Sequence, residues 1–256
     1  MRKLQNTESN VSSLVFMILT IFIWEVVINI ISLPKYILPA PSVIIKALIE
    51  SRQVLWIHTQ TTLFEALSGF IVAIITGVFI SAVMNKFKIV KNIFYPILVI
   101  SQTVPIIAIA PLFMIWMGFG ICPKIVIVVL VCFFPIAVNV TEGLALVDKD
   151  LINLMKVMKA NSWQIFFKVE LPAVMPAFFS GIKIAATYSI MGAVISEWIG
   201  AKSGLGIYMT RAMSSFRTEA LFADILIIVV LSIGLFKLIE WLEKKLMPWT
   251  ILNSKE

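Results

Sequence analysis

Long apolar stretches, separated by short polar segments, dominate this chain. Six of them are long enough to cross the hydrocarbon core of a bilayer, which takes about 20 predominantly apolar residues in a helix. They lie at residues 11–31, 62–85, 93–117, 123–141, 176–199 and 222–246. The pattern therefore predicts an all-α, polytopic membrane protein with about six transmembrane helices.

The polar segment at residues 148–172, which we name the elbow, has the pattern of two short helices. In its first half, apolar residues repeat on one helical face while lysines occupy the rest of the circumference. These apolar residues are Leu151, Leu154, Met155 and Met158. Asn161 is a candidate N-cap, and Gln164 completes a capping box. We therefore expect a second helix to start at Ser162 and to end at Pro172.

The composition supports a membrane location. Hydrophobic residues make up 60% of the 256 residues and only 14% are charged, whereas a soluble domain is typically about 45–50% apolar. The mean hydropathy is +1.01. The net charge of +7 would suit nucleic acid, but the lysines lie beside apolar stretches, where positive charge normally sets membrane orientation. Nucleic-acid binding is therefore not expected, and the lipid bilayer is the expected partner of this chain.

The distribution of basic residues predicts how the chain is oriented. Cytoplasmic segments of membrane proteins carry an excess of Lys and Arg. With both termini in the cytoplasm, the larger set of basic residues faces inward. That set is Arg2, Lys3, Lys86, Lys88, Lys91, Lys149, Lys156, Lys159, Lys168, Lys237, Lys244, Lys245 and Lys255. The smaller outer set is Lys35, Lys46, Arg52, Lys124, Lys202, Arg211 and Arg217. The elbow then faces the cytoplasm, where a soluble partner can dock on it.

No constellation of residues points to an enzyme. The G-x-x-x-x-G-K-[ST] phosphate loop is missing from the sequence, so we do not expect this chain to bind ATP by that route. His58 is the only histidine and is interpreted as a surface residue rather than a metal ligand. The glycines Gly200, Gly204 and Gly206 are interpreted as a turn. We therefore assign no catalytic residue, no cofactor and no metal to this chain.

Polar residues inside apolar stretches are costly and need a role. The third stretch carries Gln102, Thr103 and Pro105, so its helix is expected to break near the middle of the membrane. These three residues either line a substrate path or form hydrogen bonds between helices. The same alternatives apply to Asn139, Thr187 and Tyr188. Glu197 and Trp198 are candidates for an outer gate. Glu65 is expected either to make a contact between helices or to lie near an interface. Lys183 is expected to snorkel to the inner surface.

The order of these elements resembles the membrane-spanning subunit of ABC importers, in the binding-protein-dependent branch that carries nitrate, sulfonates, taurine and thiamine precursors. The resemblance rests on LPAPS at 38–42, QTVPIIAIAPLFMIWMGFG at 102–120, EWIGAKSGLGIYMTRAMSSFRTEALFADI at 197–225 and the elbow. The elbow is similar to the EAA motif of that family, Glu-Ala-Ala, three residues, Gly, nine residues, Ile, one residue, Leu-Pro. Here the spacing is kept, whereas Asn153, Leu154 and Met155 replace Glu-Ala-Ala, Lys159 replaces Gly, and Val169 replaces Ile.

The resemblance implies a type I ABC importer permease fold in the bacterial inner or plasma membrane, coupled to two ATPase subunits that bind ATP and Mg. It also implies an extracytoplasmic solute-binding protein and pairing of two identical permease chains. The elbow would dock on the ATPase. Its implied docking residues are Asn153, Leu154, Met155, Met158, Lys159, Ala160, Asn161, Trp163, Phe166, Phe167, Leu171 and Pro172. Residues 1–57 would form the cytoplasmic N-terminus, first span and outer arm, 58–246 the permease core, and 247–256 a cytoplasmic tail.

The solute is expected to be small and polar, and the 197–225 segment is most similar to permeases for hydroxymethylpyrimidine, a thiamine precursor. Import of sulfonate, nitrate or taurine is the alternative within the branch. Two alternatives from other classes are an ion-coupled secondary transporter, which would place paired acidic groups at mid-membrane, and a membrane-embedded enzyme. The single histidine argues against the enzyme.

Overall fold

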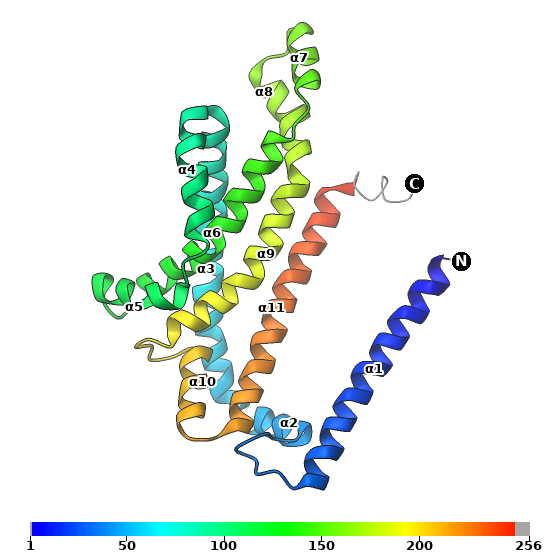
Figure 1. The fold of residues 1–256 in the computed structure, drawn as a ribbon, viewed down its shortest axis with the longest axis vertical. Coiled ribbons are helices and arrows are strands. Elements are labelled where there is room, and N and C mark those ends of the chain that lie inside the picture. Colours follow the sequence, from blue (N-terminus) through cyan, green and yellow to red (C-terminus); the bar gives the residue numbers. More distant parts are fainter. Residues whose placement is uncertain (1, 249–256) are drawn as a thin grey trace.

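The computed structural model describes residues 2–248, with side chains from residue 12 onward apart from residue 14. This part of the chain is helical throughout, joined by short turns (Figure 1). Its elements are α1 (Arg2–Ile31), α2 (Pro41–Glu50), α3 (Arg52–Lys86), α4 (Lys88–Ser101), α5 (Ile106–Met117), α6 (Ile121–Ala145), α7 (Lys149–Val157), α8 (Ser162–Ile165), a π-helical turn η1 (Phe166–Glu170), α9 (Leu171–Glu197), α10 (Leu205–Ser214) and α11 (Thr218–Leu246).

The core of the bundle lies where α3, α6, α9 and α11 pack along one another. Their largest apolar cluster includes Phe70 of α3, Ile136 of α6 and Ile190 of α9. Gly69 lets α3 approach α6 closely, because a Cβ at this position would lie 2.5 Å from Val128 Cβ. Close backbone approach at small residues is the usual way that membrane helices pack, since the lipid surroundings are as apolar as the side chains.

Four helices are long and apolar enough to cross a membrane, and each corresponds to one of the predicted stretches, although the stretch at 176–199 ends two residues beyond its helix. They are α3, α6, the continuous run Ser162–Glu197, and α11. The predicted stretch at 93–117 corresponds to α4 and α5, which together are apolar enough for one span but are bent by 104°. In α1, residues Val15–Ile31 form a shorter apolar helix. A multi-pass membrane protein is therefore confirmed, and the count of six spans stays a prediction.

The predicted break in the third stretch is confirmed at residues 102–105. α4 ends at Ser101, and α5 begins at Ile106 with Pro105 as its N-cap in an extended conformation. Proline disfavours a helical conformation in the residue before it and lacks the N–H that would continue the hydrogen-bond ladder. Pro96 and Pro111 lie inside α4 and α5 without ending them. The bend therefore depends on Pro105 together with the turn that precedes it.

The N-terminal helices lie at the edge of the bundle. α1 leans away from α11 and meets the rest of the chain at α2 (Figure 1). α2 starts at Pro41, inside the LPAPS segment, a position where proline's missing N–H costs nothing. α2 packs Ile44 and Ala47 against Ala223 of α11, and Ile45 and Ile49 are exposed on its other side.

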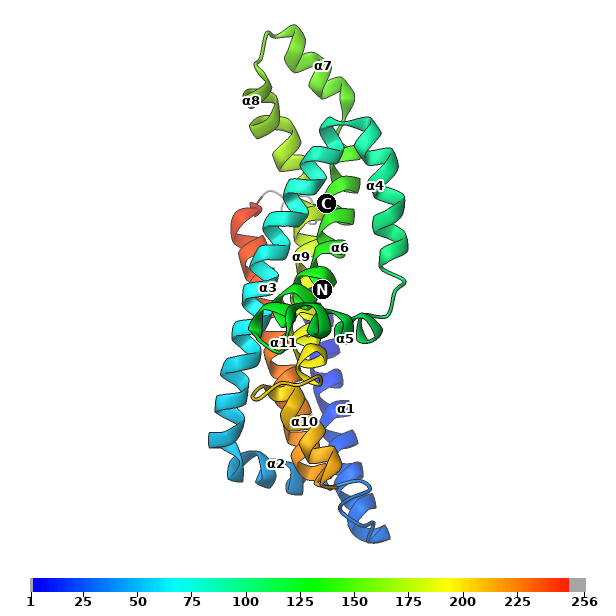
Figure 2. The same ribbon diagram turned by 90° about the vertical axis from the view of Figure 1, so that its left-hand side faces the viewer.

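The two ends of the bundle differ in composition. The elbow, the junction of α3 with α4 and the end of α11 lie toward one end, while α2 and α10 lie at the other (Figures 1 and 2). Lys86, Lys88, Lys244 and Lys245 thus lie toward the elbow end. This grouping agrees with the predicted charge asymmetry, and the orientation itself stays a prediction. Of the predicted cytoplasmic tail, residues 249–256 lie outside the described part.

Candidate functional site

The first helix of the elbow is α7, and local hydrogen bonds set both of its ends. The side chain of Asp148 accepts from Asp150 N at 2.8 Å, which caps the start. At the other end, Lys159 N donates to Lys156 O at 2.9 Å and Ala160 N donates to Met155 O at 3.0 Å. This pair of bonds forms a Schellman motif. Its left-handed residue is Lys159, with φ of 58°, at the position where the resembled motif has glycine.

The second helix of the elbow begins as predicted at Ser162. Asn161 and Gln164 form the capping box, since each side chain accepts from the backbone N–H of the other at 2.8 Å. The predicted end at Pro172 is wrong. The helix runs on through the π-helical turn η1 into α9, where Pro172 is the second residue. The wider π-helical turn accommodates the proline ring and its missing donor without ending the helix.

The elbow lies at the tip of the molecule (Figure 2). Apolar and aromatic side chains are exposed on it. Trp163 is 71% exposed and stacks on Phe167 with ring centroids 5.8 Å apart. Of the implied docking residues, the exposed ones are Asn153, Leu154, Met158, Lys159, Asn161, Trp163, Phe166 and Phe167. The half-buried ones are Met155, Ala160, Leu171 and Pro172. A contiguous apolar surface of this kind is typical of a site that a partner covers.

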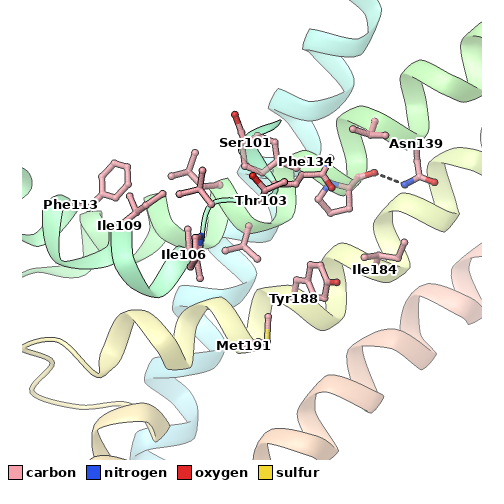
Figure 3. Close-up of a pocket in the computed structure, with 17 residues that line it drawn as sticks. Ser101, Thr103, Ile106, Ile109, Phe113, Phe134, Asn139, Ile184, Tyr188 and Met191 are labelled. Atoms are coloured by element: carbon pink, nitrogen blue, oxygen red, sulfur yellow. Dashed lines mark hydrogen bonds between the residues drawn. The ribbon is translucent and has the colours of Figure 1, made fainter. Parts of the chain in front are cut away.

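A cavity of about 740 Å³ lies beside the break between α4 and α5 (Figure 3). It is bounded by α4, α5, α6 and α9. Five of the six predicted path residues line it, namely Gln102, Thr103, Pro105, Asn139 and Tyr188. The sixth, Thr187, is outside the lining, and its hydroxyl bonds to Lys183 O on its own helix at 3.2 Å. Residues from distant parts of the sequence thus share one cavity.

The cavity combines aromatic faces with neutral polar groups. None of its seventeen lining residues, all in the described part of the chain, is charged. Asn139 Nδ2 donates to Pro135 O at 2.7 Å, which orients the amide. Phe134, Ile184 and Met191 also line the cavity and were not among the predicted path residues. Ile184, Tyr188 and Met191 follow the spacing of one helical face on α9, so a search for a polar residue with apolar neighbours at that spacing could have found the last two.

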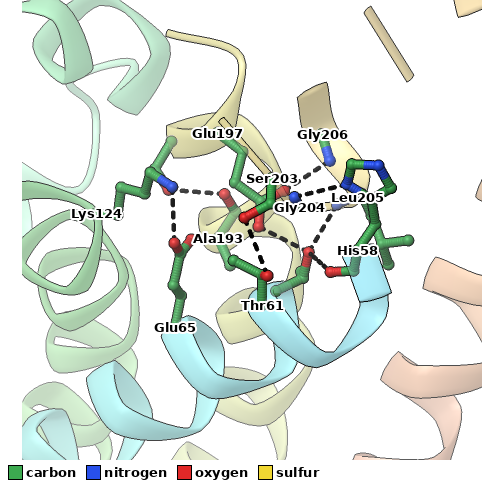
Figure 4. A network of polar contacts seen from close by, with 12 residues as sticks. His58, Thr61, Glu65, Lys124, Ala193, Glu197, Ser203, Gly204, Leu205 and Gly206 are labelled. Carbon is green, nitrogen blue, oxygen red and sulfur yellow. Dashed lines mark hydrogen bonds and ion pairs between the residues drawn. The ribbon is translucent and has the colours of Figure 1, made fainter. Parts of the chain in front are cut away.

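A network of buried polar groups lies at the opposite end of the bundle and holds the start of α10 (Figure 4). Three successive backbone amides donate hydrogen bonds to side chains of α3 and α9. Gly204 N donates to His58 Nδ1 at 2.9 Å, Leu205 N to Thr62 Oγ1 at 2.8 Å, and Gly206 N to Glu197 Oε2 at 2.6 Å. The first amides of a helix have no partner within it, so these side chains act as its caps.

The predicted turn is confirmed at Gly200 and Gly204, whereas Gly206 lies in the first turn of α10. Gly204 is essential to the geometry of this turn. Gly204 has φ of 127°, and a Cβ there would lie 2.1 Å from Glu197 Cδ. Thr62 Oγ1 also donates to Glu197 Oε1 at 2.7 Å. The carboxylate of Glu197 is therefore fully buried and engaged by α3 and α10, while Trp198 is partly exposed. Their role as an outer gate stays a prediction.

An ion pair between helices adjoins this network. Lys124 Nζ lies 2.7 Å from Glu65 Oε1, and both side chains are buried. The predicted interhelical role of Glu65 is thereby confirmed. Lys124, counted above with the outer basic residues, lies in the first turn of α6 and is buried there. The interpretation of His58 as a surface residue is wrong, because the residue is buried and accepts from Gly204. At the elbow end, Lys183 Nζ lies 3.0 Å from Glu243 Oε2.

These features define the membrane-spanning subunit of a transporter. Residues 69–248 match the family described as binding-protein-dependent transport system inner membrane component. The chain belongs to this family and is a permease subunit of the ABC importer type.

Relatives with known names span nearly the whole chain. A probable ABC transporter permease protein of Haemophilus influenzae is 36% identical over 222 residues, which cover 87% of this chain and 91% of that protein. The formylaminopyrimidine transport permease protein ThiX of Halalkalibacterium halodurans is 36% identical over 235 residues, or 91% and 94% of the two chains. The fold is similar to that in an inward-facing structure of the MetNI methionine ABC transporter, with a TM-score of 0.57, 20% identity, and coverage of 77% and 94%. The type I permease fold is thereby confirmed.

Proposed function

We propose that this chain imports a small uncharged heterocyclic solute of the thiamine-pyrimidine class. It works as two identical permease copies in the bacterial cell membrane, with two ATPase subunits on the cytoplasmic side and a solute-binding protein on the outside. ATP and Mg are bound by the ATPase subunits and no cofactor is bound by this chain. Both termini and the elbow face the cytoplasm, in agreement with the basic residues grouped toward the elbow end.

The observation that carries the coupling role is the exposed aromatic surface of the elbow. Trp163, Phe166 and Phe167 form one contiguous aromatic group, with adjacent ring centroids 5.8 and 5.1 Å apart. The elbow continues into α9 without a break, so a displacement of its tip is transmitted to a helix that lines the cavity. Closure of the ATPases would move two elbows together and shift the population between inward-open and outward-open states.

The uncharged cavity supports the choice of solute. Aromatic rings such as Phe134 and Tyr188 suit a planar ring, and the amides of Gln102 and Asn139 provide donors and acceptors for its nitrogens. A sulfonate or nitrate anion would need a cationic or strongly donating partner once it loses water. The lining supplies no Lys, Arg or His. The ThiX relative, named for formylaminopyrimidine transport, points to the same class.

The coupling role is tested by replacing Phe166 with Asp. A buried charge in the docking surface should abolish co-purification with the ATPase while leaving the permease inserted in the membrane. Phe216→Asp is the matched control, because Phe216 is an exposed aromatic residue at the opposite end of the bundle. Undiminished co-purification and transport by Phe166→Asp would show that the elbow packs on its own membrane domain instead.

The solute class is tested by uptake into proteoliposomes that contain the complete transporter. Formylaminopyrimidine should be taken up in preference to taurine, and Asn139→Leu should lower uptake by about tenfold, the effect of losing one buried hydrogen-bonding group. Thr187→Val, next to the cavity but outside its lining, serves as control. Preferential taurine uptake contradicts the solute class. Uptake driven by an ion gradient without ATPase subunits would instead favour a secondary transporter.

A further inference from the structure

A second cavity, of about 240 Å³, lies at the end of the bundle opposite the elbow. It is enclosed by the start of α3, by α10, and by the turn that leads into α11. Its polar lining residues are His58, Tyr208, Arg211, Ser215 and Arg217, and the others are aliphatic. Nothing in the transport mechanism above uses this cavity.

The polar groups of this cavity are mainly hydrogen-bond donors. His58 is 92% buried and its Nδ1 accepts from Gly204 N, which leaves Nε2 as the nitrogen that carries the hydrogen. Tyr208 places its ring 5.5 Å from the His58 ring. Arg211 forms no ion pair within the part of the chain that the structure describes, and Arg217 Nε is 3.7 Å from Glu219 Oε1. No carboxylate lines the cavity, so its positive charge is not neutralised from within.

The surroundings of the cavity are those of a membrane interface. Trp56 and Ile57 immediately precede His58 on α3 and are 62% and 55% exposed. Val54, which lines the cavity, is also exposed. Exposed aliphatic residues beside Trp and Tyr are typical of the level at which membrane proteins meet lipid headgroups. A cationic cavity at that level is suited to a phosphate group.

We propose that this cavity binds the phosphate of an anionic phospholipid, with Arg211 as its principal cation and the hydroxyl of Tyr208 and Nε2 of His58 as further donors. In the orientation proposed above, the lipid belongs to the outer leaflet, and this leaflet assignment alone rests on the proposed function. Arginine is suited to the role because its planar group donates two parallel hydrogen bonds to phosphate oxygens. The acyl chains would lie along the exposed apolar side of α3.

The test is native mass spectrometry of the purified full-length protein with added phosphatidylglycerol. The wild type should retain bound phosphatidylglycerol, and Arg211→Gln should weaken retention by about tenfold, as expected for the loss of one charge-assisted contact. Arg211→Lys should recover part of the binding, because the charge returns without the bidentate geometry. Lys202→Gln, which removes an exposed charge near the same end, should retain lipid as the wild type does.

Three results would overturn the proposal. The first is phosphatidylglycerol retention that does not change in Arg211→Gln while the variant keeps the melting temperature of the wild type. The second is binding of inorganic phosphate with the same dependence on Arg211 but no retained lipid, which would assign the cavity to a free anion. The third is loss of binding-protein association in Arg211→Gln with unchanged lipid retention, which would assign it to an acidic protein side chain. None of these measurements depends on which solute is transported or on ATPase docking.

Discussion

The two ends of the bundle use polar and apolar residues in opposite ways. At the elbow, aromatic side chains such as Trp163 are exposed, and the backbone is held by bonds between residues two to five positions apart. At the α10 end, the charged Glu65, Lys124 and Glu197 are buried, and their contacts join residues up to 135 positions apart. We propose that another molecule covers the elbow, whereas the α10 end is closed by the chain's own polar groups.

This contrast teaches where each end can tolerate change. The elbow should keep its shape when its exposed aromatic side chains are replaced, because caps and turns hold its backbone. The α10 end has little such tolerance, since a buried polar group that loses its partner retains the full cost of desolvation. Substitutions at the elbow should therefore affect association, and substitutions in the buried network should affect folding.

The largest effect on stability is expected from Lys124→Met, which removes one member of the buried ion pair. Glu65 would then be left as an uncompensated buried charge, and the expected loss is about 3–5 kcal/mol. Thermal unfolding of the detergent-solubilised protein measures it. The double variant Glu65→Leu with Lys124→Met should recover most of the loss, because two apolar side chains need no partner. A double variant as unstable as Lys124→Met would contradict this account.

A smaller loss, about 1–3 kcal/mol, is expected from Thr62→Val. The hydroxyl of Thr62 accepts from Leu205 N and donates to Glu197 Oε1, so its removal leaves a buried donor and a buried acceptor without this partner. Hydrogen exchange should show increased opening of the start of α10. Thr187→Val is the control, because its hydroxyl bonds only within its own helix. Equal effects of the two substitutions would argue against the capping role.

The smallest effect is a gain at the elbow from Lys159→Gly. Lys159 has φ of 58°, a conformation that glycine adopts without strain, so the turn should become more stable by about 0.4–1 kcal/mol. Slower hydrogen exchange of the Ala160 amide in the full-length protein would report it. Lys156→Gly, inside α7, should have the opposite sign, because glycine destabilises a helix interior by about 1 kcal/mol. A destabilised turn in Lys159→Gly would show that the side chain of Lys159 is needed.

Several features were predictable because they depend on neighbouring residues. The spacing of Asn161 and Gln164 alone predicts a helix start, and Pro105 predicts the break between α4 and α5. The apolar stretches predict the spanning helices because the length needed to cross a bilayer is set by the bilayer. The EAA-like spacing also led to the correct family, even though Lys159 stands in place of glycine.

Other features depend on which distant segments meet, and they were missed. His58 was expected at the surface, yet it is buried and accepts from an amide 146 positions away. Lys124 was counted as an outer charge because nothing near it in the sequence reveals Glu65. The error at Pro172 has a local cause instead, because the π-helical turn directly before it lets the helix continue into α9. Even the cavity lining was only partly predicted, since Phe134 differs from an ordinary lipid-facing residue only through what lies opposite it.

The linear order of residues was thus sufficient for the membrane class, four of the spanning helices, the break and the two helices of the elbow apart from the end at Pro172. These depend on hydrophobicity summed over a helix and on hydrogen bonds between near neighbours. Only the folded bundle decided which polar residues meet, which became buried, and where cavities formed between helices. The physical reason is that the cost of burying a charge is local, whereas the partner that offsets this cost can come from any part of the chain.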